Sequence, residues 1–160
     1  MFIFPEAQTD AQKKILYKIR RNKRILEAAQ RKLGLLRLKI YIKFCPLGCS
    51  ERGTCAACVP LRKFPESKHP EKNFILYIRD DKSVAFIYYC VSWMFHELRH
   101  IWQKKKGLIC STTAHFYWKG KRTFAGFAGL VYSPPWELDA DRFASKFPLT
   151  YKKQLAKMRH

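Results

Sequence analysis

Two histidines and a glutamate stand at a spacing that suits metal-assisted hydrolysis. The segment His96-Glu97-Leu98-Arg99-His100 is an HExxH sequence. Residues four apart on a helix share one face, so the two imidazoles can bind one zinc ion. Glu97 can then act as a base on a metal-bound water. The pattern predicts a metal-dependent hydrolase, most often a peptidase, with His96 and His100 as metal ligands and Glu97 as the catalytic residue.

A third ligand is expected, because a hydrolytic zinc site usually has three protein ligands and one position for water. Only three acidic residues follow His100, and they lie together at Glu137, Asp139 and Asp141. Glu137 and Asp141 are four apart and project from one helix face. We expect Glu137 to bind the metal and Asp141 to accept a hydrogen bond from the far nitrogen of a ligand histidine. The alternative is that Glu137 and Asp139 are only favourable charges near a helix N-terminus.

Hydrophobic spacing predicts the elements that position HExxH. A helix that is apolar around most of its circumference is expected from Ser83 to about Lys106, where Gly107 ends it. HExxH lies in the second half of this central, buried helix. The apolar segment Phe74–Ile78 predicts a strand, which could offer a sheet edge to an extended peptide or could lie inside the sheet.

A second helix is expected to carry Glu137. Ser133-Pro134-Pro135 predicts its start, with Ser133 as N-cap, and Pro148 predicts its end after about Phe147. A separate short basic helix is expected over residues 150–158. Residues 110–132, between the central and glutamate helices, predict a β-ribbon with a turn at Lys119-Gly120-Lys121.

The paired motifs resemble the HExxH…ExxAD signature of gluzincin metallopeptidases. The segment from Glu137 to Ala144 is also similar to the E-x-E-A-N/D-x-F-A element of ImmA/IrrE-type proteins. The resemblance covers roughly residues 74–147. It implies an α+β fold with a minimal zincin-like core, made of a small sheet, the HExxH helix and the glutamate helix. It also implies that Glu137 is the third zinc ligand and Asp141 the downstream acid.

Two other families fit less well. SprT-type proteases share basic character and DNA association but use a third histidine, and His115 is the only histidine between His100 and the last residue. Peptide deformylase combines HExxH with an upstream cysteine ligand, but the glycine-rich and cysteine motifs of that family are absent here. For the developing oxyanion, Tyr132, His115 and Arg99 are all candidate donors, and the sequence does not choose among them.

The N-terminal part lies outside the resemblance and is strongly basic. Its spacing predicts a helix over residues 10–33, capped by Thr9 or Asp10 and ended by Gly34, followed by a half-buried strand over residues 36–43. Between residues 13 and 43 only Glu27 opposes twelve lysines and arginines: Lys13, Lys14, Lys18, Arg20, Arg21, Lys23, Arg24, Arg31, Lys32, Arg37, Lys39 and Lys43.

The charge leaves two functional classes open. A formal net charge of +20 on 160 residues attracts DNA, RNA or an anionic membrane surface, although a solvated basic face would need no partner. One class is a zinc peptidase that cleaves a protein or peptide substrate, with the basic helix bringing it to nucleic acid. The other is a non-catalytic nucleic-acid-binding or regulatory protein, in which zinc only holds the fold.

Four clustered cysteines predict a second metal site. Cys45, Cys49, Cys55 and Cys58 could hold a structural zinc ion, with free thiols as the alternative. Cys90, within the apolar run, is expected to be an inert core residue.

The whole chain is expected to be one domain, because 160 residues with 48% hydrophobic content can bury a single core. No signal peptide is evident. The longest apolar run, residues 84–95, is too short to cross a bilayer, so we expect a soluble cytoplasmic protein.

Overall fold

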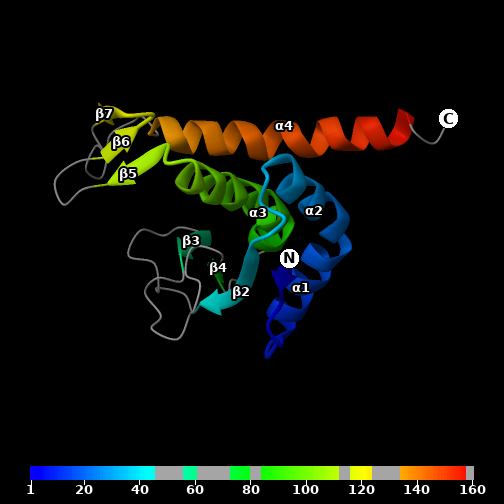
Figure 1. Ribbon diagram of the computed structural model, residues 1–160. Helices are drawn as coiled ribbons and strands as arrows, with labels where there is room; N and C mark the ends of the chain where they lie inside the picture. Colours follow the sequence, from blue (N-terminus) through cyan, green and yellow to red (C-terminus); the bar gives the residue numbers. More distant parts are fainter. Residues whose placement is uncertain (46–55, 61–72, 80–83, 112–115, 124–133, 158–160) are drawn as a thin grey trace.

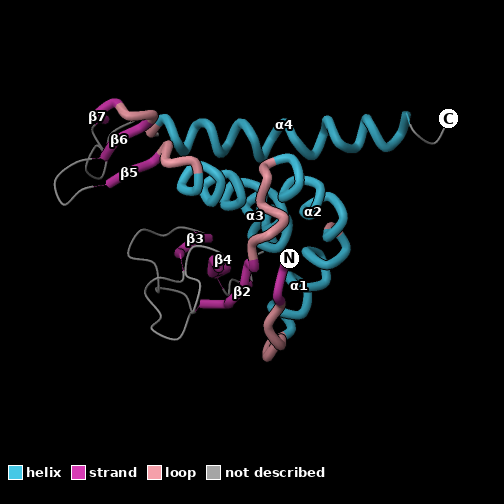
Figure 2. Tube along the Cα trace, viewed as in Figure 1, coloured by secondary structure: helices cyan, strands magenta, loops and turns pink. Residues whose placement is uncertain are grey.

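The computed structural model describes residues 1–45, 56–60, 73–79, 84–111, 116–123 and 134–157. Within these ranges the protein is an α+β fold, as the sequence predicts, with four helices, a four-stranded sheet and a three-stranded sheet. Figure 1 shows α3 lying between the larger sheet on one side and α4 on the other. Figure 2 shows the smaller sheet where α3 ends and α4 begins.

The larger sheet has the order β1-β2-β4-β3. β1, β2 and β4 run parallel, while β3 pairs antiparallel with β4. The strand predicted at Phe74–Ile78 is confirmed and lies inside the sheet. The outermost described strands are β1 and β3, neither of which the sequence revealed. The bounds are β1 (Phe2–Ile3), β2 (Lys39–Cys45), β3 (Ala56–Pro60) and β4 (Asn73–Arg79).

The strand sequences explain these positions. In β2, Ile40 and Ile42 are buried while Lys39 and Lys43 are exposed, which is the alternation expected of a strand with one solvated face. In β4 the residues from Phe74 to Leu76 are all buried, without the alternation seen in β2, as expected of a strand inside the sheet.

The basic N-terminal helix is divided in two. α1 (Asp10–Arg21) begins at the N-cap Thr9, whose hydroxyl accepts a hydrogen bond from the Gln12 amide, and α2 is Lys23–Lys32. The break lies at Asn22, whose side-chain amide donates to the Lys18 carbonyl at 2.8 Å. Asparagine competes in this way with regular helical hydrogen bonding, so the single helix predicted over residues 10–33 becomes two segments. Gly34, with φ +67°, ends α2 as predicted.

α3 (Val84–Lys105) is the predicted central helix. Met94, Phe95, Leu98 and Ile101 are almost completely buried in the core beneath it. The chain leaves the helix at Gly107, whose φ of +65° lets the Leu108 amide donate to the Gln103 carbonyl. None of the helices in the described part of the chain is long and apolar enough to cross a bilayer.

α4 (Pro135–Lys157) corrects the prediction of two helices separated at Pro148, because that proline lies inside one continuous helix. A proline in a helix interior removes a hydrogen bond and costs about 3 kcal/mol. Aromatic packing offsets this cost on both sides of Pro148. The rings of Phe143, Phe147 and Tyr151 stack along α4, and Phe147 also contacts Phe95 of α3.

The smaller sheet confirms the predicted β-ribbon within the described residues. β5 (Ile109–Ser111), β6 (Phe116–Trp118) and β7 (Lys121–Thr123) are antiparallel in that order. The two-residue turn Lys119-Gly120 joins β6 to β7 with φ of 52° and 76°, which is the backbone of a tight hairpin turn. Along the chain this sheet follows α3 and precedes α4.

Candidate metal centre

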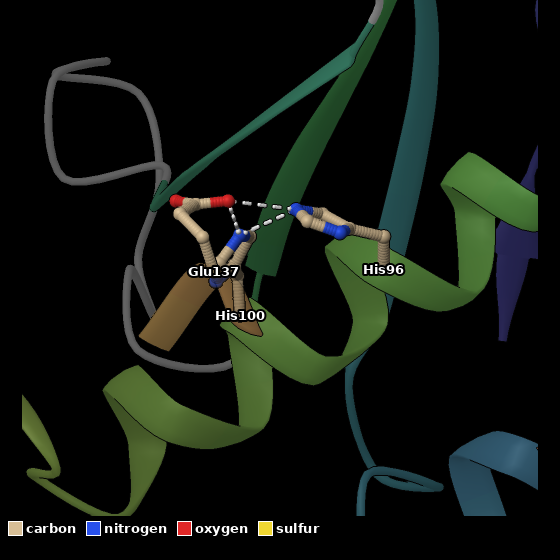
Figure 3. A group of neighbouring side chains, drawn as sticks. All are labelled: His96, His100 and Glu137. Carbon is tan, nitrogen blue, oxygen red and sulfur yellow. Dashed lines mark hydrogen bonds and ion pairs between the residues drawn. The ribbon is translucent and has the colours of Figure 1, made fainter. Parts of the chain in front are cut away.

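Three side-chain atoms from two helices meet at one point. His96 and His100 project from the same face of α3, one turn apart, and Glu137 reaches them from the first turn of α4 (Figure 3). The two Nε2 atoms are 2.8 Å apart, and Glu137 Oε2 lies 3.0 Å from His96 Nε2 and 3.2 Å from His100 Nε2. The structure therefore brings together the three residues that the sequence predicts as metal ligands.

The other ring nitrogen of each histidine has an acceptor as its partner. His96 Nδ1 lies 2.8 Å from the Asp141 carboxylate, the contact predicted for that acid. His100 Nδ1 lies 2.8 Å from the side-chain oxygen of Gln103. An acceptor at Nδ1 is the partner that a metal-binding histidine needs there, because a proton held on Nδ1 leaves the Nε2 lone pair free for a metal.

Three electron-rich atoms therefore face one another at about 3 Å, an arrangement that needs a positive charge between them. In a tetrahedral zinc site with bonds of about 2.05 Å, neighbouring ligand atoms are about 3.3 Å apart. The triangle formed by His96, His100 and Glu137 thus needs to open by only about a few tenths of an ångström to hold such an ion. The three residues fit a divalent metal in both spacing and chemistry.

The charges around the site strengthen this fit. Burial lowers the pKa of His96, but the hydrogen bond with Glu137 and the negative charges of Glu97, Glu137 and Asp141 outweigh it, and the pKa is raised. Burial raises the pKa of Glu137, but hydrogen bonds with His100 and His96 and their charges outweigh it and hold that pKa far below its ordinary value. A proton on His96 can supply the positive charge between these atoms, and a bound metal would displace that proton.

A second group of residues, which the sequence reasoning missed, holds His100 in place. The Gln103 side-chain nitrogen donates to the Trp136 carbonyl at 3.0 Å and to Asp139 at 2.7 Å. With its nitrogen committed to two acceptors, Gln103 must present its oxygen to His100 Nδ1. His100 and Gln103 are three residues apart on a helix, and this spacing could have indicated that their side chains are in contact.

Arg99 holds this group in place through a bidentate ion pair with Asp139. Its guanidinium donates to both oxygens of Asp139 at 2.8 and 3.1 Å, and its carbon lies 3.8 Å from the centre of the Trp102 ring. Burial raises the pKa of Asp139, but the hydrogen bonds from Arg99 and Gln103 outweigh it and lower that pKa. Arg99 is thus committed to Asp139, while the other two candidate oxyanion donors, His115 and Tyr132, lie outside the described residues.

Glu97 lies between the two histidines on α3 and is only 6% exposed. Its charge acts on His96, since it contributes to the raised pKa of that histidine. The role of Glu97 as a base stays a prediction.

The four-cysteine site stays a prediction, because Cys49 and Cys55 lie outside the described residues. Cys45 ends β2 and Cys58 lies in β3, and these strands flank β4 on opposite sides. Cys90 is buried in the core, as predicted. Burial raises the pKa of its thiol, which keeps the reactive thiolate scarce.

Comparisons with protein-family models, with curated proteins and with solved structures find no match to this chain.

Replacing Glu137 by Ala should remove one equivalent of bound metal per chain, because two histidines alone hold a divalent ion much more weakly than three ligands. Metal content by elemental analysis after gel filtration measures this loss and also identifies the metal. Counting equivalents separates this site from any metal on the cysteines. Glu27→Ala, a matched change on α2, should leave the metal content unchanged. An unchanged metal content in Glu137→Ala would show that Glu137 is not a ligand.

Replacing Gln103 by Leu should weaken metal binding about 10- to 100-fold, because His100 loses the partner that fixes its orientation and tautomer. Affinity is measured by competition with a coloured chelator. Gln30→Leu is the matched control, since Gln30 is a buried glutamine of α2 whose side-chain amide has no hydrogen-bond partner within the described structure. It should keep full metal affinity. Equal affinities in wild type and Gln103→Leu would rule out the orienting role.

Proposed function

We propose that the protein is a zinc-dependent peptidase. The observation that carries this proposal is the convergence of His96, His100 and Glu137, with the buried Glu97 between the two histidines. A set of two histidines and one glutamate is a donor set of zinc hydrolases, which keep a fourth position for water. The order of the elements (strand β4, helix α3, small sheet, helix α4) supports a zincin-like core, as the resemblance to gluzincins implies.

The proposed mechanism assigns a role to each residue. Bound zinc would supply a Lewis acid that polarises the peptide carbonyl and makes a bound water acidic near neutral pH. Glu97 takes the proton from the attacking water and then passes it to the leaving amine. His96, His100 and Glu137 hold the metal, while Asp141 and Gln103 keep the imidazole lone pairs directed at it.

Substrate would bind along β3. This strand is the outermost described strand on its side of the sheet, and it contacts α3, the helix of the metal centre. An extended peptide can add to such an edge through main-chain hydrogen bonds. The pairing of β4 on both sides excludes β4 from this role.

A Glu97→Gln variant should bind zinc as wild type does and lose about 10²- to 10⁴-fold in hydrolysis rate, because the amide cannot accept a proton. The assay incubates metal-loaded protein with a mixture of random peptides and detects new termini by mass spectrometry. Glu27→Gln should keep the wild-type rate. Cleavage by Glu97→Gln at the wild-type rate would exclude Glu97 as the base. A metal-loaded wild type that cleaves no peptide would favour the alternative, a regulatory protein in which the metal only holds the fold.

As a second function, we propose that the surface of α1 and α2 binds DNA or RNA. This surface, here called the basic face, carries exposed cations over both helices: Lys13, Lys14, Arg20, Arg21, Lys23, Arg24, Arg31 and Lys32. On these helices only Asp10 and Glu27 oppose them, paired with Lys13 and Lys23 respectively. Exposed ion pairs of this kind are weak, so most of the positive charge stays available to phosphates.

Binding to nucleic acid should weaken steeply with salt, because each neutralised phosphate releases counterions. The double variant Lys14→Ala/Arg21→Ala should lower the slope of log K against log salt by about two. Fluorescence anisotropy with a labelled oligonucleotide measures the slope. Lys121→Ala/Arg122→Ala on β7 removes equal charge from the other end of the molecule and should leave the slope unchanged. Equal slopes in all three proteins would exclude the basic face as the contact.

A further inference from the structure

A hollow of about 380 Å³ opens on the basic face. Its apolar wall is formed by Phe4, Pro5, Leu16 and Tyr17. In Figure 1 the helix α1, which forms one side of the hollow, lies at the opposite end of the molecule from the start of α4, where Glu137 sits. The hollow is therefore separate from the metal centre, and its ligand would differ from a substrate bound there. Its volume is in the range of small-molecule sites and suits one flat ring system.

Tyr17 offers a ring surface to such a ligand. Its side chain is 67% exposed, although an aromatic residue gains stability when it is buried. Lys13 and Arg20 lie four residues before and three residues after it, so all three share one face of α1. An exposed ring between two cations is the combination that binds a base by stacking and its phosphate by charge.

The rim of the hollow carries both cations and one acid. Arg20 is positioned by the Phe4 ring, whose centre lies 5.4 Å from the guanidinium carbon. Lys13 pairs with Asp10 at 3.0 Å, but both side chains are mostly exposed, so the pair is weak and a phosphate can replace it. Glu6 also lines the hollow. A carboxylate repels a bare anion, but it can accept hydrogen bonds from the amino group of a nucleobase.

The charge continues beyond the hollow. Further exposed cations lie on both helices. They are Lys14 and Arg21 on α1, and Lys23, Arg24 and Arg31 on α2. A free nucleotide would need only the cations at the rim. A run of cations that extends along two helices instead suits a chain of phosphates.

We propose that the hollow binds an unpaired nucleobase stacked on Tyr17, within a single-stranded nucleic acid whose phosphates lie along the basic face. This inference rests on the nucleic-acid binding proposed above and specifies that the nucleic acid is single-stranded. In a duplex the bases stack on one another, so their faces cannot reach a tyrosine ring.

The test measures the anisotropy of a short labelled oligothymidylate and of a labelled duplex of equal length, with wild type and three variants. Tyr17→Ala should bind the single strand about 5- to 150-fold more weakly than wild type, with an unchanged salt slope because no cation is removed. Tyr17→Phe keeps the ring and should bind as wild type does. Tyr89→Ala removes a comparably exposed tyrosine of α3 and should also bind as wild type does.

The outcomes test the stacking site separately from nucleic-acid binding by the basic face. Tyr17→Ala binding the single strand as tightly as wild type would overturn the stacking site and leave the basic face intact. Equal wild-type affinity for duplex and single strand would also overturn it. Wild type that binds neither oligonucleotide at low salt would overturn both the stacking site and the basic face as a nucleic-acid surface. Peptidase activity of the metal centre is independent of all these results.

Discussion

The convergence of His96 Nε2, His100 Nε2 and Glu137 Oε2 is the constraint around which the contact between α3 and α4 is built. These atoms lie 2.8 to 3.2 Å apart and all present lone pairs. Their lone pairs alone would push the two helices apart, because like partial charges repel at this distance. Positive charge between them, from a proton or a divalent metal, turns the same geometry into an attraction that joins the two helices.

The apolar core and the polar network around the site support each other. Arg99 lies against the rings of Trp102 and Phe143, so aromatic packing fixes the guanidinium that holds Asp139. Asp139 in turn holds Gln103, which fixes the ring of His100. The arrangement of the candidate ligands at the end of this chain of contacts therefore depends on aromatic packing between α3 and α4, and a core substitution there would reach them.

The sequence predicts the parts of this structure that depend on local chemistry. The two histidines of HExxH, and the acids at residues 137 and 141, lie at helical spacing, so each short segment predicts side chains on one helix face. Gly34 and Gly107 end helices because glycine readily adopts a positive φ. The contact of His96 with Glu137 joins residues 41 apart, but both lie in recognisable motifs, so it too was predicted.

The features that escaped prediction depend on partners distant in sequence. The two residues of β1 form a strand only because β2 lies beside them, and β3 is a strand only because it pairs with β4. α4 continues through Pro148 because aromatic rings of the same helix and of α3 pack on both sides of that residue. The role of Gln103 follows from the Trp136 carbonyl and Asp139, neither of which a local pattern connects to it.

Because α3 supplies two of the candidate ligands and α4 the third, metal occupancy and the docking of α4 are linked equilibria. A metal present at 100 times its dissociation constant would favour the docked state by about 2.7 kcal/mol. The linkage is reciprocal. A partner that draws α4 away from α3 would lower the affinity for metal, and a bound metal would lower the affinity for that partner by the same factor. A metal bound at this site would thereby tie the attachment of α4 to the free metal concentration around the protein.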